Sequence, residues 1–208
     1  NFYIKIPAGF SKTVYNDNIN WPYYTKETDN TANRKIRFPR GKVVGGSSSI
    51  NGHLYVRGQA DDYDGWAQKG CLGWSWSDVL PYFKRMENYG GGEDDFRGVD
   101  GPLHVHRADP QDPITLAFIK AGQEAGYPRT NDISGFCQEG FGVSDRTVYN
   151  GERWSTARAY LDPARKRSNL KIQTGSIVHK ITFEGTKAVA VTYMTGSGAL
   201  TVSYTHLR

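Results

Sequence analysis

The change of hydrophobic period near residue 170 is the feature that most constrains the fold of this chain. From Leu170 to Val202, apolar and polar residues alternate in the run "LKIQTGSIVHKITFEGTKAVAVTYMTGSGALTV". A period of two is typical of β-strands with one buried face. Turn residues interrupt the alternation at 184–186 and 196–198. The run therefore predicts a meander of antiparallel strands.

Helical patterns precede this meander. The run "DPITLAFIKAGQEAG" predicts a helix with Asp112 as its N-cap, Pro113 at its first position and Gly126 at its end. A second helix is expected in "SDVLPYFKRM", with Asp78 as the N-cap and Pro81 in the first turn. The chain thus combines segments of both periods, which predicts a mixed α/β (α+β) class.

The remaining segments carry weaker local signals. Residues 1–40 alternate aromatic and polar residues without a helical period, and we expect extended, irregular structure there. A short strand is expected in "GPLHVHR", and a further helical segment is expected from Ser155, interrupted at Pro163.

Composition narrows the classes of function. The net charge is +5 over 208 residues, and the Lys and Arg residues form no block, so we do not expect nucleic-acid binding. The two cysteines suit free thiols in a reducing compartment, which favours a cytoplasmic location. No apolar run approaches the length of a membrane span, and no signal peptide opens the sequence. The first residue is Asn1 rather than Met, so we expect a piece of a longer protein.

The stretch "RGKVVGGSSSINGHLYVRG" is the strongest candidate for a binding site. Gly45 and Gly46 allow the main chain to approach a ligand closely, and consecutive amides in such a turn can point at one anion. The three serines that follow and Asn51 add hydrogen-bond donors, while Arg40 and Lys42 add positive charge. These features predict a phosphate or pyrophosphate cradle. A flexible Gly/Ser linker is the alternative, and composition alone weights the two evenly.

Other chemical motifs are absent from the sequence. It contains no GxGxxG, GxSxG or HExxH pattern, and no phosphate-binding loop of the GxxxxGK[ST] kind. His104 and His106 are two residues apart on an expected strand and could face one metal ion. Because such a pair is more often the polar face of a strand, we expect no metal site.

Residues 41–64, "GKVVGGSSSINGHLYVRGQADDYD", closely resemble the first signature of the glucose–methanol–choline flavoprotein oxidoreductases. The resemblance continues through "GWSWSDVLPYFKRMEN" and "NGERWSTARAYLDPARKRSNL" to about residue 202. Within that family the sequence is most similar to those of the choline dehydrogenases and related alcohol dehydrogenases. It implies parts of an FAD-binding Rossmann-type domain and of a substrate domain built on an antiparallel sheet.

The resemblance also implies a division of the chain. Residues 1–68 would contact FAD, and residues 69–168 would belong mainly to the substrate domain and connecting helices. Residues 169–202 would return to the FAD domain as the β-meander. The last six residues, 203–208, match nothing that is expected there, and we expect a non-native tail.

Specific residues follow from the same resemblance. Residues that the family places along the FAD are Val43, Gly45, Gly46, Asn51, Gly52, His53 and Leu54, with Val178 beside the adenine. Some members carry a His that is bonded covalently to the flavin where this chain has Ile50. The resemblance therefore implies that FAD is bound non-covalently.

The implied activity is hydride transfer from the CH–OH group of choline or a similar small alcohol to flavin N5. The family's GxGxxG fingerprint and catalytic His do not occur in this sequence. We therefore expect an internal fragment that is inactive alone, and we assign no catalytic residue. The alternative is a short, non-catalytic member that acts as a binding or interaction module. The sequence does not identify the exact alcohol, the electron acceptor or the oligomeric state.

Overall fold

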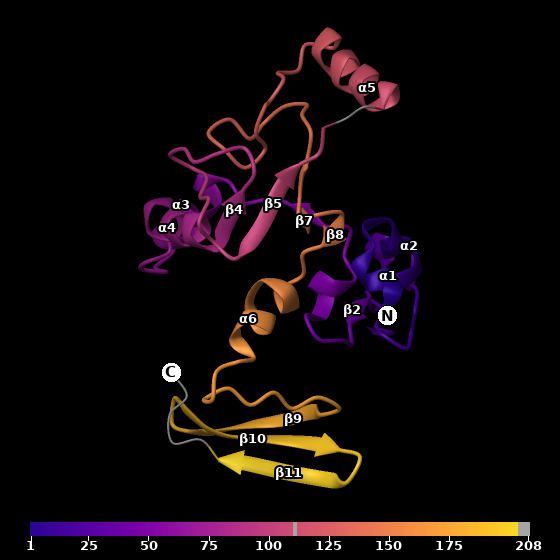
Figure 1. Ribbon diagram of the computed structural model, residues 1–208, viewed down its shortest axis with the longest axis vertical. Coiled ribbons are helices and arrows are strands. Elements are labelled where there is room, and N and C mark those ends of the chain that lie inside the picture. The colour runs from indigo at the N-terminus through magenta and orange to yellow at the C-terminus, as the bar shows by residue number, and fades with distance from the viewer. Residues whose placement is uncertain (110–111, 204–208) are drawn as a thin grey trace. The chain divides into compact units, whose positions relative to one another are not determined.

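The computed structural model describes residues 1–109 and 112–203, which fall into two compact units (Figure 1). The first unit is Asn1–Arg165 and the second is Lys166–Arg208. The finer division predicted from the sequence, at residues 68 and 168, stays a prediction.

The first unit begins with three short helical turns, so the prediction of irregular structure is wrong for this segment. They are α1 (Phe2–Lys5), η1 (Pro7–Gly9) and α2 (Phe10–Thr13). Asn1 caps α1 by accepting a hydrogen bond of 3.0 Å from the Tyr3 amide. Each turn is too short to display a helical period, so capping and Pro7 define these elements.

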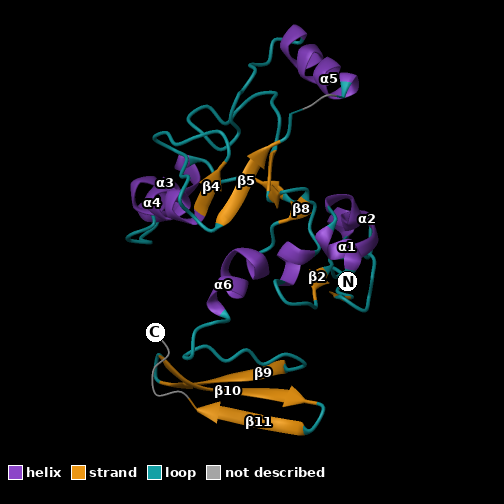
Figure 2. Ribbon diagram, in the orientation of Figure 1, coloured by secondary structure: helices purple, strands orange, loops and turns teal. Residues whose placement is uncertain are grey.

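A mixed four-stranded sheet lies at the centre of this unit (Figure 2). In spatial order its strands are β3 (Leu54–Tyr55), β6 (Asp145–Arg146), β5 (Leu103–Arg107) and β4 (Glu87–Tyr89). The strand β4 runs parallel to β5, and the other pairs are antiparallel. Two small antiparallel pairs accompany the sheet: β1 (Asn20–Trp21) with β2 (Arg40–Gly41), and β7 (Val148–Tyr149) with β8 (Glu152–Arg153). The strand predicted in "GPLHVHR" is confirmed as β5.

The apolar core packs on this sheet. Its buried members are Tyr55, Tyr89, Leu103, Val105 and Ala159, with Met86 and Trp154 packed against them. Ala159 belongs to η4 (Ala157–Leu161), a π-helical turn that forms the start of the helical segment predicted from Ser155. The core thus joins β3, which follows the Gly-rich stretch, to η4 from a distant part of the sequence.

The segment after η4 continues as α6 (Asp162–Ala164). Pro163 lies in the first turn of α6, where a missing N–H group is tolerated. The proline therefore belongs to a new helical turn and does not end the segment.

Two helices follow β3: α3 (Ala60–Gln68) and α4 (Trp76–Met86). The N-cap of α4 is Ser75, so the prediction of Asp78 as N-cap is wrong. Asp78 instead completes a capping box, since its carboxylate accepts from the Ser75 amide at 3.1 Å and its amide donates to the Ser75 hydroxyl at 3.3 Å. Pro81 accordingly lies inside the helix and not in the first turn.

The helix predicted after Asp112 is confirmed as α5 (Pro113–Glu124). Asp112 accepts from the Ile114 amide at 3.2 Å, and Gly126 has a positive φ of 89° just past the end. Ile119 and Gly122 are its buried residues, whereas Ile114 is 78% exposed. The apolar side of α5 is therefore largely uncovered in this unit.

The second unit is the predicted meander. Its strands β9 (Ile177–Glu184), β10 (Lys187–Thr195) and β11 (Gly198–Ser203) pair antiparallel in the order β11-β10-β9. Turns at residues 185–186 and 196–197 separate the strands as expected, and Gly185 and Gly198 have positive φ values. The first strand begins at Ile177 and not at residue 170. The predicted non-native tail falls mostly on residues 204–208, which lie outside the described residues.

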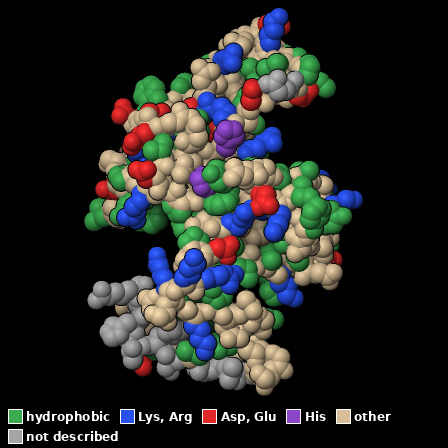
Figure 3. Space-filling model, viewed as in Figure 1, with side chains coloured by type: hydrophobic (Ala, Val, Ile, Leu, Met, Phe, Trp, Pro, Cys, Tyr) green, Lys and Arg blue, Asp and Glu red, His purple; other side chains and the backbone are tan. Residues whose placement is uncertain are grey.

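Surface charge, cysteine exposure and helix length are relevant to the predicted partners and location. On the face seen in Figure 3, Lys and Arg side chains are interspersed with acidic and apolar ones. Cys71 and Cys137 are exposed free thiols. Among the described residues, no helix is long and apolar enough to cross a membrane.

Candidate cofactor site

The Gly-rich stretch forms a tight turn between two strands. After β2 the chain turns at Gly45, enters the 3₁₀ helix η3 (Gly46–Ser49), and reaches β3 at Leu54. Gly45 and Gly46 have φ values of 90° and 56°. These left-handed conformations favour glycine because it has no Cβ. The stretch is thus a defined structure and not a flexible linker.

Its glycines serve two different purposes. A Cβ on Gly41 would lie 2.2 Å from the carbonyl oxygen of Gly46, and one on Gly45 would lie 2.5 Å from the Ser49 hydroxyl. These two glycines allow the turn to close on itself. At Gly46 and Gly52, in contrast, a Cβ would meet no atom of the described residues within 4 Å. The main chain is therefore open to an approaching group at these two positions.

The hydroxyls of the serines support the turn itself. Ser48 Oγ donates to the Gly45 carbonyl at 2.6 Å, and Ser49 Oγ donates to the Val44 carbonyl at 2.8 Å. The Ser47 hydroxyl accepts from the Gly41 amide at 3.2 Å. The prediction that Ser48 and Ser49 donate to a ligand is wrong in this structure, because their protons are used inside the segment.

A distant segment packs on the turn. The hydroxyls of Ser48 and Thr156 lie 2.9 Å apart, and the Thr156 amide donates to Ser48 Oγ at 3.0 Å. Thr156 Oγ1 also donates to the Gly45 carbonyl at 3.3 Å. The turn is therefore fixed by residues more than 100 positions later in the chain.

Arg153 lies behind the same turn and is 1% exposed. Its Nη1 donates to the carbonyls of Ser48 at 3.1 Å and Asn51 at 2.8 Å, and to Asn51 Oδ1 at 2.8 Å. Its Nε donates to the carbonyl of Ile4 in α1 at 2.9 Å. Burial lowers the pKa of Arg153 to about 10, so the side chain stays charged at neutral pH.

His53 is buried, with a φ of 66° that is unusual for a residue other than glycine. Its amide donates to Asn51 Oδ1 at 3.1 Å, and its carbonyl accepts from the Thr147 amide at 2.9 Å. Its Nε2 is buried without a hydrogen-bond partner in the described part of the chain. Burial, followed by the charge of Arg153, lowers the pKa of the imidazole. His53 is therefore neutral at physiological pH.

The structure brings seven of the eight predicted cofactor residues into one segment. Val43, Gly45, Gly46, Asn51, Gly52, His53 and Leu54 all lie between β2 and the start of β3. Asn51, Gly52 and Leu54 are exposed, and Leu54 is 60% exposed. Val178 lies on β9 in the second unit, where it pairs with Tyr193 of β10.

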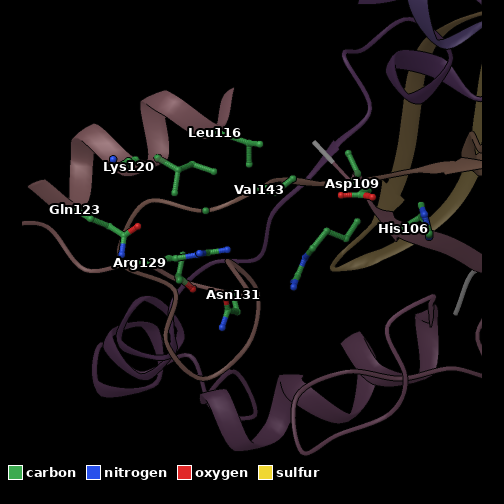
Figure 4. Close-up of a pocket in the computed structure, with 13 residues that line it drawn as sticks. His106, Asp109, Leu116, Lys120, Gln123, Arg129, Asn131 and Val143 are labelled. Carbon is green, nitrogen blue, oxygen red and sulfur yellow. The ribbon is translucent and has the colours of Figure 1, made fainter. Parts of the chain in front are cut away.

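A cavity of about 970 Å³ lies in the first unit, away from the Gly-rich stretch (Figure 4). In the close-up, Leu116, Lys120 and Gln123 from α5 lie across from Arg129 and Asn131. None of the predicted cofactor residues lines this cavity. In the described part of the chain, no cluster of three or more His, Cys, Asp or Glu residues could hold a metal ion.

Comparison with known proteins identifies the family. The sequence profile described as GMC oxidoreductase matches residues 7–206. The chain belongs to the GMC oxidoreductase family. This finding confirms the resemblance seen in residues 41–64 and the predicted mixed fold.

Relatives in this family share almost half of the sequence. An oxygen-dependent choline dehydrogenase of Brucella anthropi is 47% identical over 199 residues, covering 96% of this chain and 36% of the relative. One from Rhizobium johnstonii is 48% identical over 189 residues, covering 91% of this chain and 34% of the relative. The chain thus spans about a third of the length of these relatives.

Solved structures of other proteins agree on the fold. Pyridoxine 4-oxidase from Mesorbium loti superimposes with a TM-score of 0.88 at 32% identity, covering 98% of this chain and 40% of the other. An FAD-dependent oxidoreductase from Chaetomium thermophilum gives a TM-score of 0.87 at 28% identity, covering 99% of this chain and 37% of the other.

Sequence reasoning missed the contribution of Arg153 to this GMC segment. The residue follows Glu152 in an ordinary polar context, and single-sequence patterns carry no signal for a partner 102 positions away. Its position between a turn and a helical segment gave no reason to expect burial.

Proposed function

We propose that the full-length protein is an FAD-dependent oxidoreductase that oxidises the CH–OH group of choline or a similar small alcohol. Support comes from family membership and from 47% identity to an oxygen-dependent choline dehydrogenase. This proposal extends beyond the described chain, which spans about a third of such relatives.

The observation that carries the proposal is the open main chain at Gly46 and Gly52. No atom of the described residues occupies the space where a Cβ would stand, so a planar or phosphorylated group can approach the backbone closely. The buried, unpartnered Nε2 of His53 adds a polar group beside this segment. The open backbone at Gly46 and Gly52 therefore fits the close approach of a large cofactor.

The proposed cofactor residues are those of the segment itself. Val43, Gly45 and Gly46 would lie along the pyrophosphate and ribityl part with Asn51 nearby, and the backbone of Gly52, His53 and Leu54 would lie beside the flavin ring. Val178, on β9 of the second unit, is proposed from resemblance alone as a neighbour of the adenine.

When bound, FAD supplies a two-electron acceptor for the hydride that leaves the alcohol carbon. The residues of this chain would bind and orient the cofactor, and the exposed side chain of Leu54 would be available to pack beside it. We assign no general base to these residues. We further propose that FAD is held without a covalent bond, since Ile50 has no nucleophilic atom and is 3% exposed.

The test is expression of the full-length gene product. We expect the purified protein to carry a flavin absorption spectrum, and choline added without oxygen to bleach that spectrum. Glycine betaine, which keeps the trimethylammonium group but lacks the hydroxyl, is the matched control and should leave the flavin oxidised. A protein that binds no flavin would contradict the cofactor assignment. Bound flavin that no small alcohol reduces would favour a non-catalytic binding role.

A further inference from the structure

We propose that Arg153 is a positioning residue of the cofactor segment, residues 43–54. It holds residues 48–51 so that the backbone of Gly52 and Leu54 faces the flavin. This inference rests on the proposed function. Arg153 lies on β8, more than 100 residues after the segment it holds, and it would act through that segment without touching the cofactor.

Arg153 carries its positive charge in a buried position. The side chain is 1% exposed, and no carboxylate within the described residues forms an ion pair with it. A buried cation without a counter-ion is unfavourable unless hydrogen bonds compensate it. An arginine retained under these conditions therefore needs its acceptors, which are mainly the carbonyls of the cofactor segment.

The acceptors of Arg153 lie on two separate segments of the chain. One nitrogen, Nη1, reaches Ser48 O, Asn51 O and Asn51 Oδ1, while Nε reaches Ile4 O on the other side. Only a planar guanidinium presents donors in a fixed fork toward two segments at once. A lysine keeps the charge but cannot reproduce this arrangement. Arg153 thereby sets the path of residues 48–51 relative to α1.

The side chain of Asn51 connects Arg153 to His53. Asn51 Oδ1 accepts from Arg153 and also from the amide of His53, at 3.1 Å. The same side chain thus transmits the position of Arg153 to the left-handed residue His53, which lies between Gly52 and Leu54. A shift of the guanidinium would change the orientation of the two exposed residues that are proposed to face the flavin ring.

The experiment compares Arg153→Lys with Arg165→Lys in the full-length protein. Arg165 is a matched control, because it is exposed and its ion pair within the described residues is with Asp162, at 3.0 Å. Flavin is removed from each protein, FAD is added back, and flavin fluorescence gives the Kd while absorption gives the shape of the bound spectrum. We expect Arg153→Lys to raise the Kd at least about tenfold, equal to about 1.4 kcal/mol, and to alter the spectrum. Arg165→Lys should match the wild type.

The contrary result is a folded Arg153→Lys protein, by circular dichroism, with the wild-type Kd and spectrum. If that variant does not fold, hydrogen exchange of the wild-type apoprotein tests the inference instead. Positioning by Arg153 predicts that the amides of residues 50, 51 and 53 are protected before FAD is added, and rapid exchange there would overturn it. Failure of the wild type to bind FAD would refute the proposed function, whereas a normal Arg153→Lys protein would refute only this inference.

Discussion

Arg97 and Asp145, 48 residues apart, form a 2.8 Å ion pair in which both side chains are fully buried. Arg97 also lies 3.0 Å from Glu87, whose other carboxylate oxygen pairs with Arg57 at 2.5 Å. Arg57 follows β3 by two residues. The cluster therefore links the strand after the cofactor segment to β4 and β6, and holds that end of the segment in place.

Asp145→Asn should lower the stability of the full-length protein by about 3 kcal/mol, because it leaves the buried Arg97 with less compensating charge and removes a partner of the half-buried Arg107. The midpoint of urea unfolding measures the change. The matched control is Asp162→Asn, which removes an exposed pair and should cost less than about 1 kcal/mol. Equal losses of stability in the two variants would show that the buried ion pair contributes no more than the exposed one.

Local features of this fold could be predicted from the sequence. The helix α5 and the meander β9–β11 follow from period, caps and turn residues, which act within a few positions. The N-cap of α4 is also within reach of the sequence, because Ser75 and Asp78 have the spacing of a capping box, which favours Ser75 over Asp78 as the N-cap.

Long-range features could not be predicted in the same way. The glycine segment was identified as a candidate site from composition and resemblance, yet the roles of its serines depend on the fold. The hydroxyl protons of Ser48 and Ser49 bond to carbonyls of the same turn, and Thr156 and Arg153 complete the turn. Contacts across more than 100 residues depend on packing, for which one sequence carries no periodic signal.

The two glycines of the turn should respond differently to alanine. At Gly45 a Cβ would lie 2.5 Å from the Ser49 hydroxyl and 3.1 Å from Ala157 Cβ, so Gly45→Ala should destabilise the apoprotein by more than the ~1–2 kcal/mol of left-handed strain. At Gly46 the new methyl group meets open space, and only the strain applies. Thermal unfolding of the two apoproteins compares these effects.

The affinity for FAD should also distinguish Gly46→Ala from Gly45→Ala. Because the Gly46→Ala methyl group would project into space assigned to the cofactor, we expect its loss of FAD affinity to exceed what its small loss of stability explains. Titration with FAD at a temperature where both apoproteins are folded provides the measurement. Unchanged affinity in Gly46→Ala would place the cofactor away from this glycine.

Protonation of His53 should weaken the folded state in acid. Burial and the charge of Arg153 lower the pKa of this imidazole in the folded protein below its ordinary value of 6.5. As the pH falls below 6.5, the unfolded chain takes up a proton that folded His53 still resists. Stability contributed by neutral His53 is thus complete above 6.5 and decreases toward the lower folded pKa, by at most about 1.4 kcal/mol per pH unit.

Chemical unfolding of the apoprotein between about pH 8 and about pH 5 tests this prediction. His53→Asn is the suitable variant, because asparagine tolerates the left-handed φ of 66°. His104, whose pKa burial also lowers, contributes to both proteins and cancels in the difference. The stability of the wild type should therefore fall more steeply in acid than that of the variant, and parallel curves would exclude His53 as the cause.

Denaturation should release all of the flavin from the full-length protein. The resemblance to the family places Ile50 where some members carry a His bonded to the flavin, and the aliphatic side chain of Ile50 would form no such bond. His53 does not replace it, since its Nε2 is buried and its ring packs edge-on against Phe10 with centroids 6.3 Å apart. Acid precipitation followed by centrifugation should leave FAD in the supernatant and a colourless pellet. A flavoprotein with a known histidyl–flavin bond, treated in parallel, should keep its colour in the pellet. Flavin that remains with the precipitated protein would require an attachment at another residue.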